Sequence, residues 1–205
     1  MKKVDYKKDF KALYLPGEQP EILHIPAMPF ILVSGHGDPN APDFSAAMEA
    51  LYSLSYAVKM SYKSDAVPEG YYEYTVFPLE GVWDLVDFGS GVSDKSNFKY
   101  DIMIRQPDFL DNGLFERFLA ATKKKKPNPY LDKAKFVTLG EGLACQMMHI
   151  GSYDSEPESF RRMEAHCSER GYTRSSLTHR EIYLSDPRRV APDKLRTVLR
   201  FTVSR

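Results

Sequence analysis

Apolar and polar residues alternate most regularly in the stretch Thr178–Arg189, near the end of the chain. Period-two alternation predicts a half-buried strand in which Ile182 and Leu184 share one face, suited to packing beneath a helix. The opposite face carries an imidazole, a carboxylate and a phenol: His179, Glu181 and Tyr183. Pro187 ends the strand because proline cannot donate to the ladder. Such a polar row is either a solvated outer face or the wall of a site.

The same periodicities predict the elements of the first half. Strands are expected at 30–35, 71–79 and 98–105, with an ambiguous segment at 81–85. A helix should follow Pro42, with Asp43 placed to cap it. We interpret its apolar stripe as core: Phe44, Met48, Leu51, Tyr52, Ser55 and Tyr62.

Two more helices and three more strands complete the pattern. One helix runs from near Asp111 to Lys126 and ends in four lysines, which complement the helix dipole; phosphate binding is the alternative role for them. The other opens at Ser155 with the S-x-x-E pattern of a capping box and ends near Gly171. The strands are a pair within 135–150 and a last strand at 195–203.

The two halves of the chain share one order of elements: strand, helix, strand, strand. Residues 42–53 align without gaps on 157–168, and Pro, Met, Glu, Ala and Ser recur in register. In each half a strand with a glutamate follows the helix, Glu73 in the first half and Glu181 in the second. We therefore predict an α+β fold of tandem repeats with pseudo-twofold symmetry around a central ligand groove, with the helices on the opposite, outer side.

These boundaries predict a single domain over residues 1–205. It consists of a proline-punctuated leader at 1–29, a first half-repeat at 30–110, a linking helix at 111–130 and a second half-repeat at 131–205. The N-terminus lacks the apolar segment of a signal peptide, and no long apolar run follows it. The two cysteines form no CxxC motif, so free thiols in a cytoplasmic protein are expected.

Charge and composition narrow the class of partner. Twenty-eight basic residues balance 28 acidic ones, so the chain has no electrostatic footprint for nucleic acid or an anionic membrane. The 13 tyrosines and 12 phenylalanines suit a ligand pocket that is apolar but still forms hydrogen bonds. No Walker loop, GxGxxG motif or metal-ligand spacing is present, so we expect no cofactor and no metal.

Four stretches resemble a known family: residues 51–57, 68–81, 103–109 and 178–189. Together with the turn at 149–153 they are similar to the GyrI-like small-molecule-binding proteins, whose fold is that of the effector-binding domain of BmrR-type transcription activators. The resemblance implies a groove lined by aromatic residues with a buried glutamate, which corresponds to Glu181. Some stand-alone members are cyclopropanoid hydrolases, which detoxify DNA-alkylating natural products by opening their cyclopropane ring. No helix-turn-helix pattern precedes the resembling stretches, so we expect a chain that is not a complete transcription factor of the BmrR kind.

Alternation assigns the walls of the expected groove. The first half would supply Tyr71, Glu73, Thr75 and Phe77, and the second His179, Glu181 and Tyr183. The only tryptophan, Trp83, is either a flat wall for a planar ligand or a core residue. His149 and His179 either assist proton transfer or are structural.

Two chemistries fit such a groove. In the first, Glu181 is a general base for water that attacks an electrophilic ring carbon, and Tyr183 or Tyr71 stabilises the oxyanion. In the second, Glu181 is the counter-ion of a cation held between aromatic faces. The preferred reading is a cyclopropanoid hydrolase acting on a hydrophobic planar molecule. The alternatives are a non-catalytic multidrug-binding or regulatory module and a gyrase-inhibitor-like interaction protein; a monomer and a homodimer both remain open.

Overall fold

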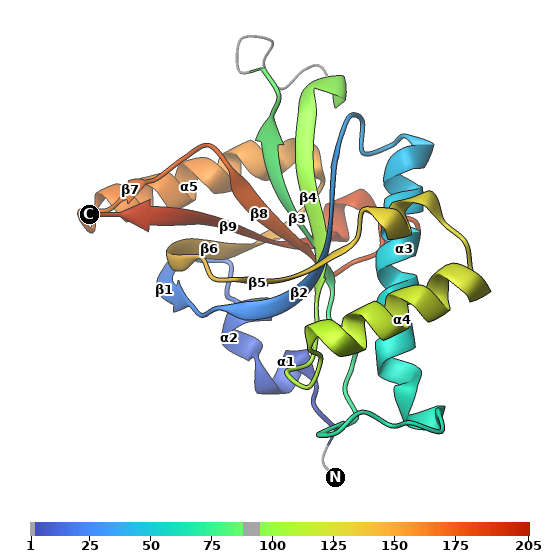
Figure 1. Ribbon diagram of the computed structural model, residues 1–205. Coiled ribbons are helices and arrows are strands. Elements are labelled where there is room, and N and C mark those ends of the chain that lie inside the picture. The colour runs from blue at the N-terminus through green and yellow to red at the C-terminus, as the bar shows by residue number, and fades with distance from the viewer. Residues whose placement is uncertain (1–2, 88–94) are drawn as a thin grey trace. The chain divides into compact units, whose positions relative to one another are not determined.

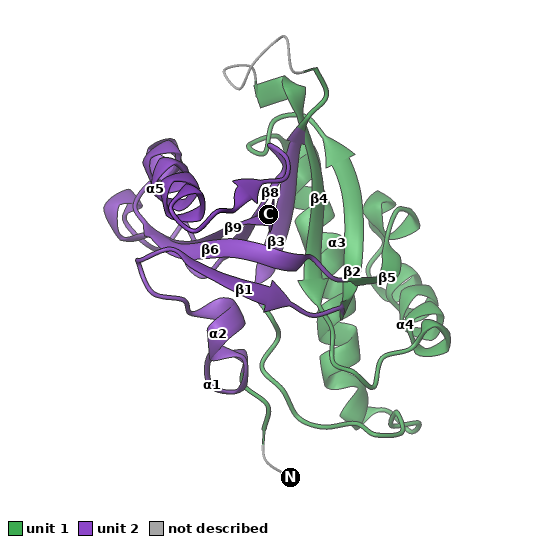
Figure 2. Ribbon diagram, turned by 90° about the vertical axis from the view of Figure 1, so that its left-hand side faces the viewer, with its two compact units in different colours: residues 1–5, 28–77, 85–139 green, residues 6–27, 78–84, 140–205 purple. Residues whose placement is uncertain are grey.

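The computed structural model describes residues 3–87 and 95–205, and its strand pairs are antiparallel (Figure 1). The chain divides into two compact units (Figure 2). Unit 1 comprises residues 1–5, 28–77 and 85–139, and unit 2 comprises residues 6–27, 78–84 and 140–205. Both units combine helices with antiparallel strands, which confirms the predicted α+β class.

Unit 1 is built on a buried central strand, β2 (Met28–His36), with β4 (Phe98–Arg105) on one side and β5 (Lys135–Leu139) on the other. The run from Phe30 to Val33 is buried throughout, as expected for a strand covered on both faces. The helices of this unit are α3 (Pro42–Lys59) and α4 (Asn112–Lys125), with short 3-10 turns η1 (Met60–Lys63), η3 (Lys95–Asn97) and η4 (Pro129–Asp132).

Unit 2 has the strand order β1-β6-β9-β8-β3, and β7 pairs with β9. Its strands are β1 (Glu21–Ile25), β3 (Leu79–Leu85, whose last residue falls in unit 1), β6 (Gly142–Ile150), β7 (Thr173–Arg174), β8 (His179–Tyr183) and β9 (Arg196–Ser204). Its helices are α1 (Tyr6–Asp9), α2 (Lys11–Tyr14), α5 (Glu156–Ser168), η5 (Tyr153–Ser155) and η6 (Pro192–Lys194).

Helix α5 covers the face of the unit 2 sheet on which Glu181 lies. A buried apolar cluster joins the helix to β6 and β9: Cys145, Met147, Met163, Cys167, Leu199, Phe201 and Val203. Glu181 is paired directly with Leu199 across β8 and β9, so both side chains leave the same face. The expectation that the helix lies on the side opposite to Glu181 is therefore wrong for unit 2, because the apolar side chains of β6 and β9 are on that face.

The repeat is present in the order of elements, but one strand was assigned to the wrong residues. The first half runs β2-α3-β3-β4 and the second β6-α5-β8-β9. Residues 71–78 form no strand; Tyr74 makes an isolated bridge to Val4, and the strand begins at Leu79. The counterpart of β8 is thus β3, so the predicted equivalence of Glu73 and Glu181 is wrong.

The predicted caps of α3 and α5 are not formed. Asp43 lies inside the first turn of α3, whose N-cap residue is Ala41, and Ser155 makes no capping bond although α5 begins directly after it. Tyr52 and Tyr62, predicted as core, are 38% and 47% exposed. The predicted start of α4 near Asp111 is confirmed, and the side chain of Asp111 caps the helix by accepting a hydrogen bond from the Leu114 N–H.

The compact units cut across the predicted subdivision of the chain. Residues 6–27 of the expected leader, and β3 from the first half, belong to unit 2. Residues 1–2 of that leader lie outside the described residues. Among the helices of the described residues, none has the length and apolar character needed to cross a bilayer.

Candidate functional site

The candidate site is built around Glu181, in the middle of β8. The residue is 9% exposed, and its carboxylate accepts a hydrogen bond from His179 Nε2 at 3.1 Å. Tyr183, two residues on, also hydrogen-bonds Glu181. The Trp83 indole N–H donates to the Tyr183 oxygen at 2.8 Å. Since indole nitrogen only donates and a carboxylate only accepts, the Tyr183 O–H points to Glu181.

Gly81 makes room for this chain of hydrogen bonds. It is paired with Glu181 across β3 and β8. A Cβ at this position would lie 2.7 Å from Trp83 Nε1 and 3.1 Å from the Tyr183 hydroxyl. A side chain larger than hydrogen would therefore displace one of the two rings.

A second buried carboxyl group, Glu156, lies against Glu181 from the first residue of α5. It is 6% exposed, and its Oε1 has no hydrogen-bond partner among the described residues. Burial, the charge of Glu181 and a hydrogen bond between the two groups raise the pKa of Glu156 well above its ordinary value. The helix N-terminus favours the charged form by only about 0.3–1 kcal/mol, less than the cost of burying a second charge beside Glu181. Burial beside Glu181 therefore favours the protonated form of Glu156.

Aromatic rings contact the side chains that hydrogen-bond Glu181. The ring of Tyr153 meets that of Tyr183 edge-on at 6.1 Å, and Phe160 meets the His179 ring at 4.8 Å. Burial and then the charges of Glu181 and Glu156 raise the pKa of Tyr153 to about 12. Burial and then the charge of Glu181 raise the pKa of Tyr183 as well. Both phenols are therefore neutral at physiological pH.

His149 has the contacts of a structural histidine. Its Nδ1 lies 2.9 Å from Ser159 Oγ, and its Nε2 lies 3.0 Å from the Ser152 carbonyl oxygen. The carbonyl can only accept, so Nε2 carries the hydrogen, and Nδ1 accepts from the serine hydroxyl. This pattern joins β6 to α5 and engages both ring nitrogens.

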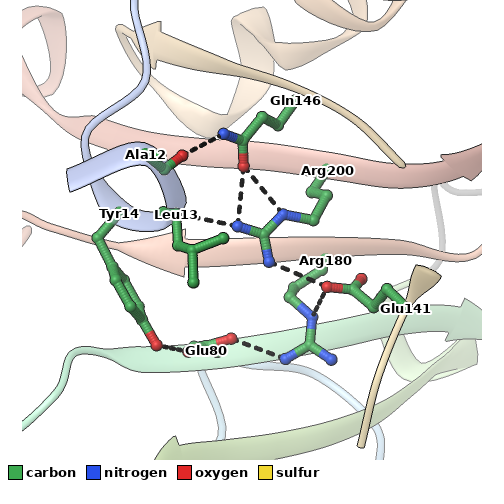
Figure 3. Close-up of polar contacts among 8 residues, drawn as sticks. All are labelled: Ala12, Leu13, Tyr14, Glu80, Glu141, Gln146, Arg180 and Arg200. Carbon is green, nitrogen blue, oxygen red and sulfur yellow. Dashed lines mark hydrogen bonds and ion pairs between the residues drawn. The ribbon is translucent and has the colours of Figure 1, made fainter. Parts of the chain in front are cut away.

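The other face of β8 carries a buried ionic network (Figure 3). Arg180 contacts Glu80 at 2.7 Å and Glu141 at 3.1 Å, and Arg200 contacts Glu141 at 2.9 Å. Burial alone would raise the pKa of Glu141, but the two arginine charges outweigh burial and lower it. The network reaches the N-terminal segment through the Tyr14 hydroxyl, which donates to Glu80, and through the Leu13 carbonyl, which accepts from Arg200. The network therefore anchors the face of β8 opposite to Glu181.

Four predicted site residues of the first half lie in unit 1, each in its own setting. Glu73 is an exposed side chain, 60% accessible, with Lys3 Nζ at 3.7 Å. The Tyr71 hydroxyl donates to the Lys59 carbonyl at 2.8 Å, and the Thr75 N–H donates to the Val4 carbonyl. Phe77 is buried beneath the Arg105 guanidinium, 4.7 Å from its ring centre. The four therefore do not share one strand face, because the segment is not a strand.

Four of the nine predicted site residues come together, all in unit 2. Glu181, Tyr183, His179 and Trp83 are brought together, and Trp83 is both a buried ring and a hydrogen-bond donor. Sequence reasoning missed Glu156, Tyr153 and Gly81. In the sequence Glu156 is one of two glutamates in the first turn of a predicted helix, and nothing local distinguishes it from an ordinary helix-opening carboxylate. In residues 3–87 and 95–205, no three His, Cys, Asp or Glu side chains are grouped to hold a metal ion.

Comparison with known proteins identifies the family. The family described as the GyrI-like small molecule binding domain matches residues 18–203. The chain belongs to this family. No curated protein matches it. The GyrI-like domain thus extends from before β1 to the last strand.

Solved structures similar to this GyrI-like domain agree over nearly its whole length. An uncharacterized conserved protein from Listeria innocua is 35% identical with a TM-score of 0.93, covering 98% of this chain and 100% of that one. A hydrolase from Listeria innocua is 34% identical with a TM-score of 0.90 and the same coverage. The EcmrR C-terminal domain, 14% identical with a TM-score of 0.54 over 91% of this chain and 98% of that one, shares the fold.

Proposed function

We propose that this GyrI-like domain hydrolyses small molecules bearing a cyclopropane ring conjugated to a carbonyl group, and so detoxifies DNA-alkylating compounds. The observation that carries the proposal is the environment of Glu181, a buried carboxylate held by His179 and Tyr183 among aromatic rings. A hydrolase with 34% identity over the full length of that chain adds support. Planar electrophiles fit such surroundings because aromatic faces stack on them.

Glu181 is the general base of the proposed reaction. It takes a proton from water as the water oxygen bonds to a ring carbon and the strained carbon–carbon bond breaks. The electron pair of that bond moves through the conjugated system to the carbonyl oxygen, which then needs a hydrogen-bond or proton donor. Tyr183 and Tyr71 were the candidates for that donor, but the Tyr183 hydroxyl is directed to Glu181 and the Tyr71 hydroxyl to the Lys59 carbonyl.

Replacing Glu181 by Gln tests the base directly. The amide keeps the size of the side chain but cannot accept the proton, so ring opening should slow by about 10²–10⁴-fold. Binding of a neutral ring-opened product should be nearly unchanged, because its apolar contacts remain. Mass spectrometry measures the gain of one water, and fluorescence of Trp83 measures binding.

Glu73→Gln is the matched control, since Glu73 is exposed in unit 1. It should leave turnover unaltered. Unaltered turnover in Glu181→Gln would remove Glu181 from the mechanism.

The second candidate function is sequestration without chemistry, with Glu181 as the counter-ion of a lipophilic cation. The buried carboxylate between aromatic rings also favours this function. Turnover separates the two, because an enzyme releases product in excess of its own concentration, whereas a sequestering protein saturates at one equivalent. A loss of affinity for cations alone in Glu181→Gln, with no turnover in the wild type, would favour sequestration.

A further inference from the structure

We propose that Glu156 is the general acid of this site: it protonates the carbonyl oxygen of the substrate while Glu181 takes a proton from the attacking water. This role rests on the proposed function and supplies the donor that it requires. Glu156 is buried, is hydrogen-bonded to Glu181, and has an oxygen, Oε1, with no partner among the described residues. In the resting site the Glu156 O–H is directed at Glu181, and a half-turn of the carboxyl group carries it to the position of Oε1, where no other described group competes for it.

Negative charges near Glu156 favour its protonated form. Glu181 faces it from β8, and Asp154 adds a further negative charge from η5, which also favours the protonated form. Tyr183 and His179 donate to Glu181 rather than to Glu156. The base is therefore held by neighbours of its own, and Glu156 keeps the one transferable proton of the pair.

Two carboxyl groups and one water molecule account for every proton that moves in this step. Water gives its proton to Glu181 and its oxygen to the ring carbon, and the carbon–carbon bond breaks toward the carbonyl. The carbonyl oxygen takes the proton from Glu156. A proton then passes from Glu181 to Glu156 along their hydrogen bond and restores the starting state, so that the product is substrate plus one water.

Glu156→Gln tests the acid, because an amide can donate a hydrogen bond but cannot give up a proton. The value of kcat should fall by about 10²–10⁴-fold. The alkaline limb of the pH–rate profile should disappear, whereas the acid limb, which reports ionisation of the pair toward the base, should remain. Glu158→Gln is the matched control two residues along the same helix, since Glu158 is exposed and paired with Arg161 at 2.7 Å. It should change neither kcat nor the profile.

A substrate series separates proton donation from a structural role. An electron-withdrawing substituent that acidifies the enol formed when the carbonyl oxygen is protonated reduces the need for an acid, so it should restore much of the rate of Glu156→Gln but not that of Glu181→Gln. Equal rescue of both variants, or a wild-type rate and profile in Glu156→Gln, would overturn the role of Glu156 while the hydrolase function stands. Absence of turnover by the wild type would overturn both.

Infrared difference spectra provide a readout that needs no substrate. Wild type minus Glu156→Gln at neutral pH should show the carbonyl stretch of a protonated carboxylic acid, and wild type minus Glu158→Gln should not. A carboxylate band in place of the acid band would overturn the assignment of the proton to Glu156.

Discussion

At the scale of single residues, the site depends on the absence of a side chain at Gly81. Gly81 stands opposite Glu181 and leaves the space in which the Trp83 N–H reaches Tyr183. Tyr183 in turn donates its O–H to Glu181. The orientation of the proposed base therefore depends on a glycine with no chemistry of its own.

Gly81→Ala should disturb this chain. The added Cβ at 2.7 Å from Trp83 Nε1 must push the indole or the phenol away, at a cost of about 1–3 kcal/mol in the free energy of unfolding. Because Trp83 is the only tryptophan, its fluorescence emission should shift in the folded variant. Gly113→Ala is the control, as its Cβ would meet Asp111 Oδ1 only at 3.5 Å. An unshifted emission in Gly81→Ala would contradict the packing described.

At the scale of elements, alternation along β8 places the candidate site on one face of the strand and the buried ionic network on the other. Arg180 enters the ionic network, and its neighbours His179 and Glu181 enter the site. A slip of one residue in the register with β3 or β9 would exchange the two faces. The buried network opposes such a slip, because each arginine would lose its carboxylate partners.

Glu141→Gln should show what the network contributes. Glu141 contacts both Arg180 and Arg200, so its removal leaves two buried guanidinium groups short of a partner. Loss of one member of a buried ion pair costs about 3–5 kcal/mol, and urea denaturation should show a decrease of that order. Glu158→Gln, which breaks an exposed pair with Arg161, should cost at most about 0.5 kcal/mol. Equal effects of the two substitutions would contradict the buried role of the network.

At the scale of the whole molecule, Glu156 and Glu141 should change the pH dependence of the free energy of unfolding in opposite directions. The pKa of Glu156 is raised in the folded protein, and that of Glu141 is lowered. The contribution of Glu156 is complete below the unfolded pKa of about 4.3 and is lost as the pH rises through its folded pKa. The contribution of Glu141 is present above that unfolded pKa and is lost as the pH falls through its folded value.

Glu156→Gln should therefore gain stability relative to the wild type as the pH rises. Between about pH 4.3 and the folded pKa of Glu156, the folded wild type binds more protons than the unfolded chain, so its free energy of unfolding falls by up to about 1.4 kcal/mol per pH unit from this group. Denaturant titrations from pH 4 to pH 8 should show the difference between variant and wild type growing in favour of the variant. A constant difference would mean that Glu156 titrates normally.

The sequence by itself determined the parts of this protein whose signals are local. Alternation located β8 and assigned Glu181 and Tyr183 to one face, and the apolar periodicity located β2, β4, α4 and β9. Long matching stretches indicated the GyrI-like family, which the match over residues 18–203 confirms. These features are readable because each is encoded within a few consecutive residues.

Tertiary structure decided the composition of the candidate site. Glu156 and Gly81 lie 25 residues before and 100 residues before Glu181 in the chain, and neither has a local signal that distinguishes it from a helix-opening carboxylate or a turn glycine. The segment around Glu73 has the alternation of a strand but pairs only at an isolated bridge. Which strand lies beside β8, and which carboxyl group lies against Glu181, follow from pairing and packing between distant segments, and periodicity carries no information about these.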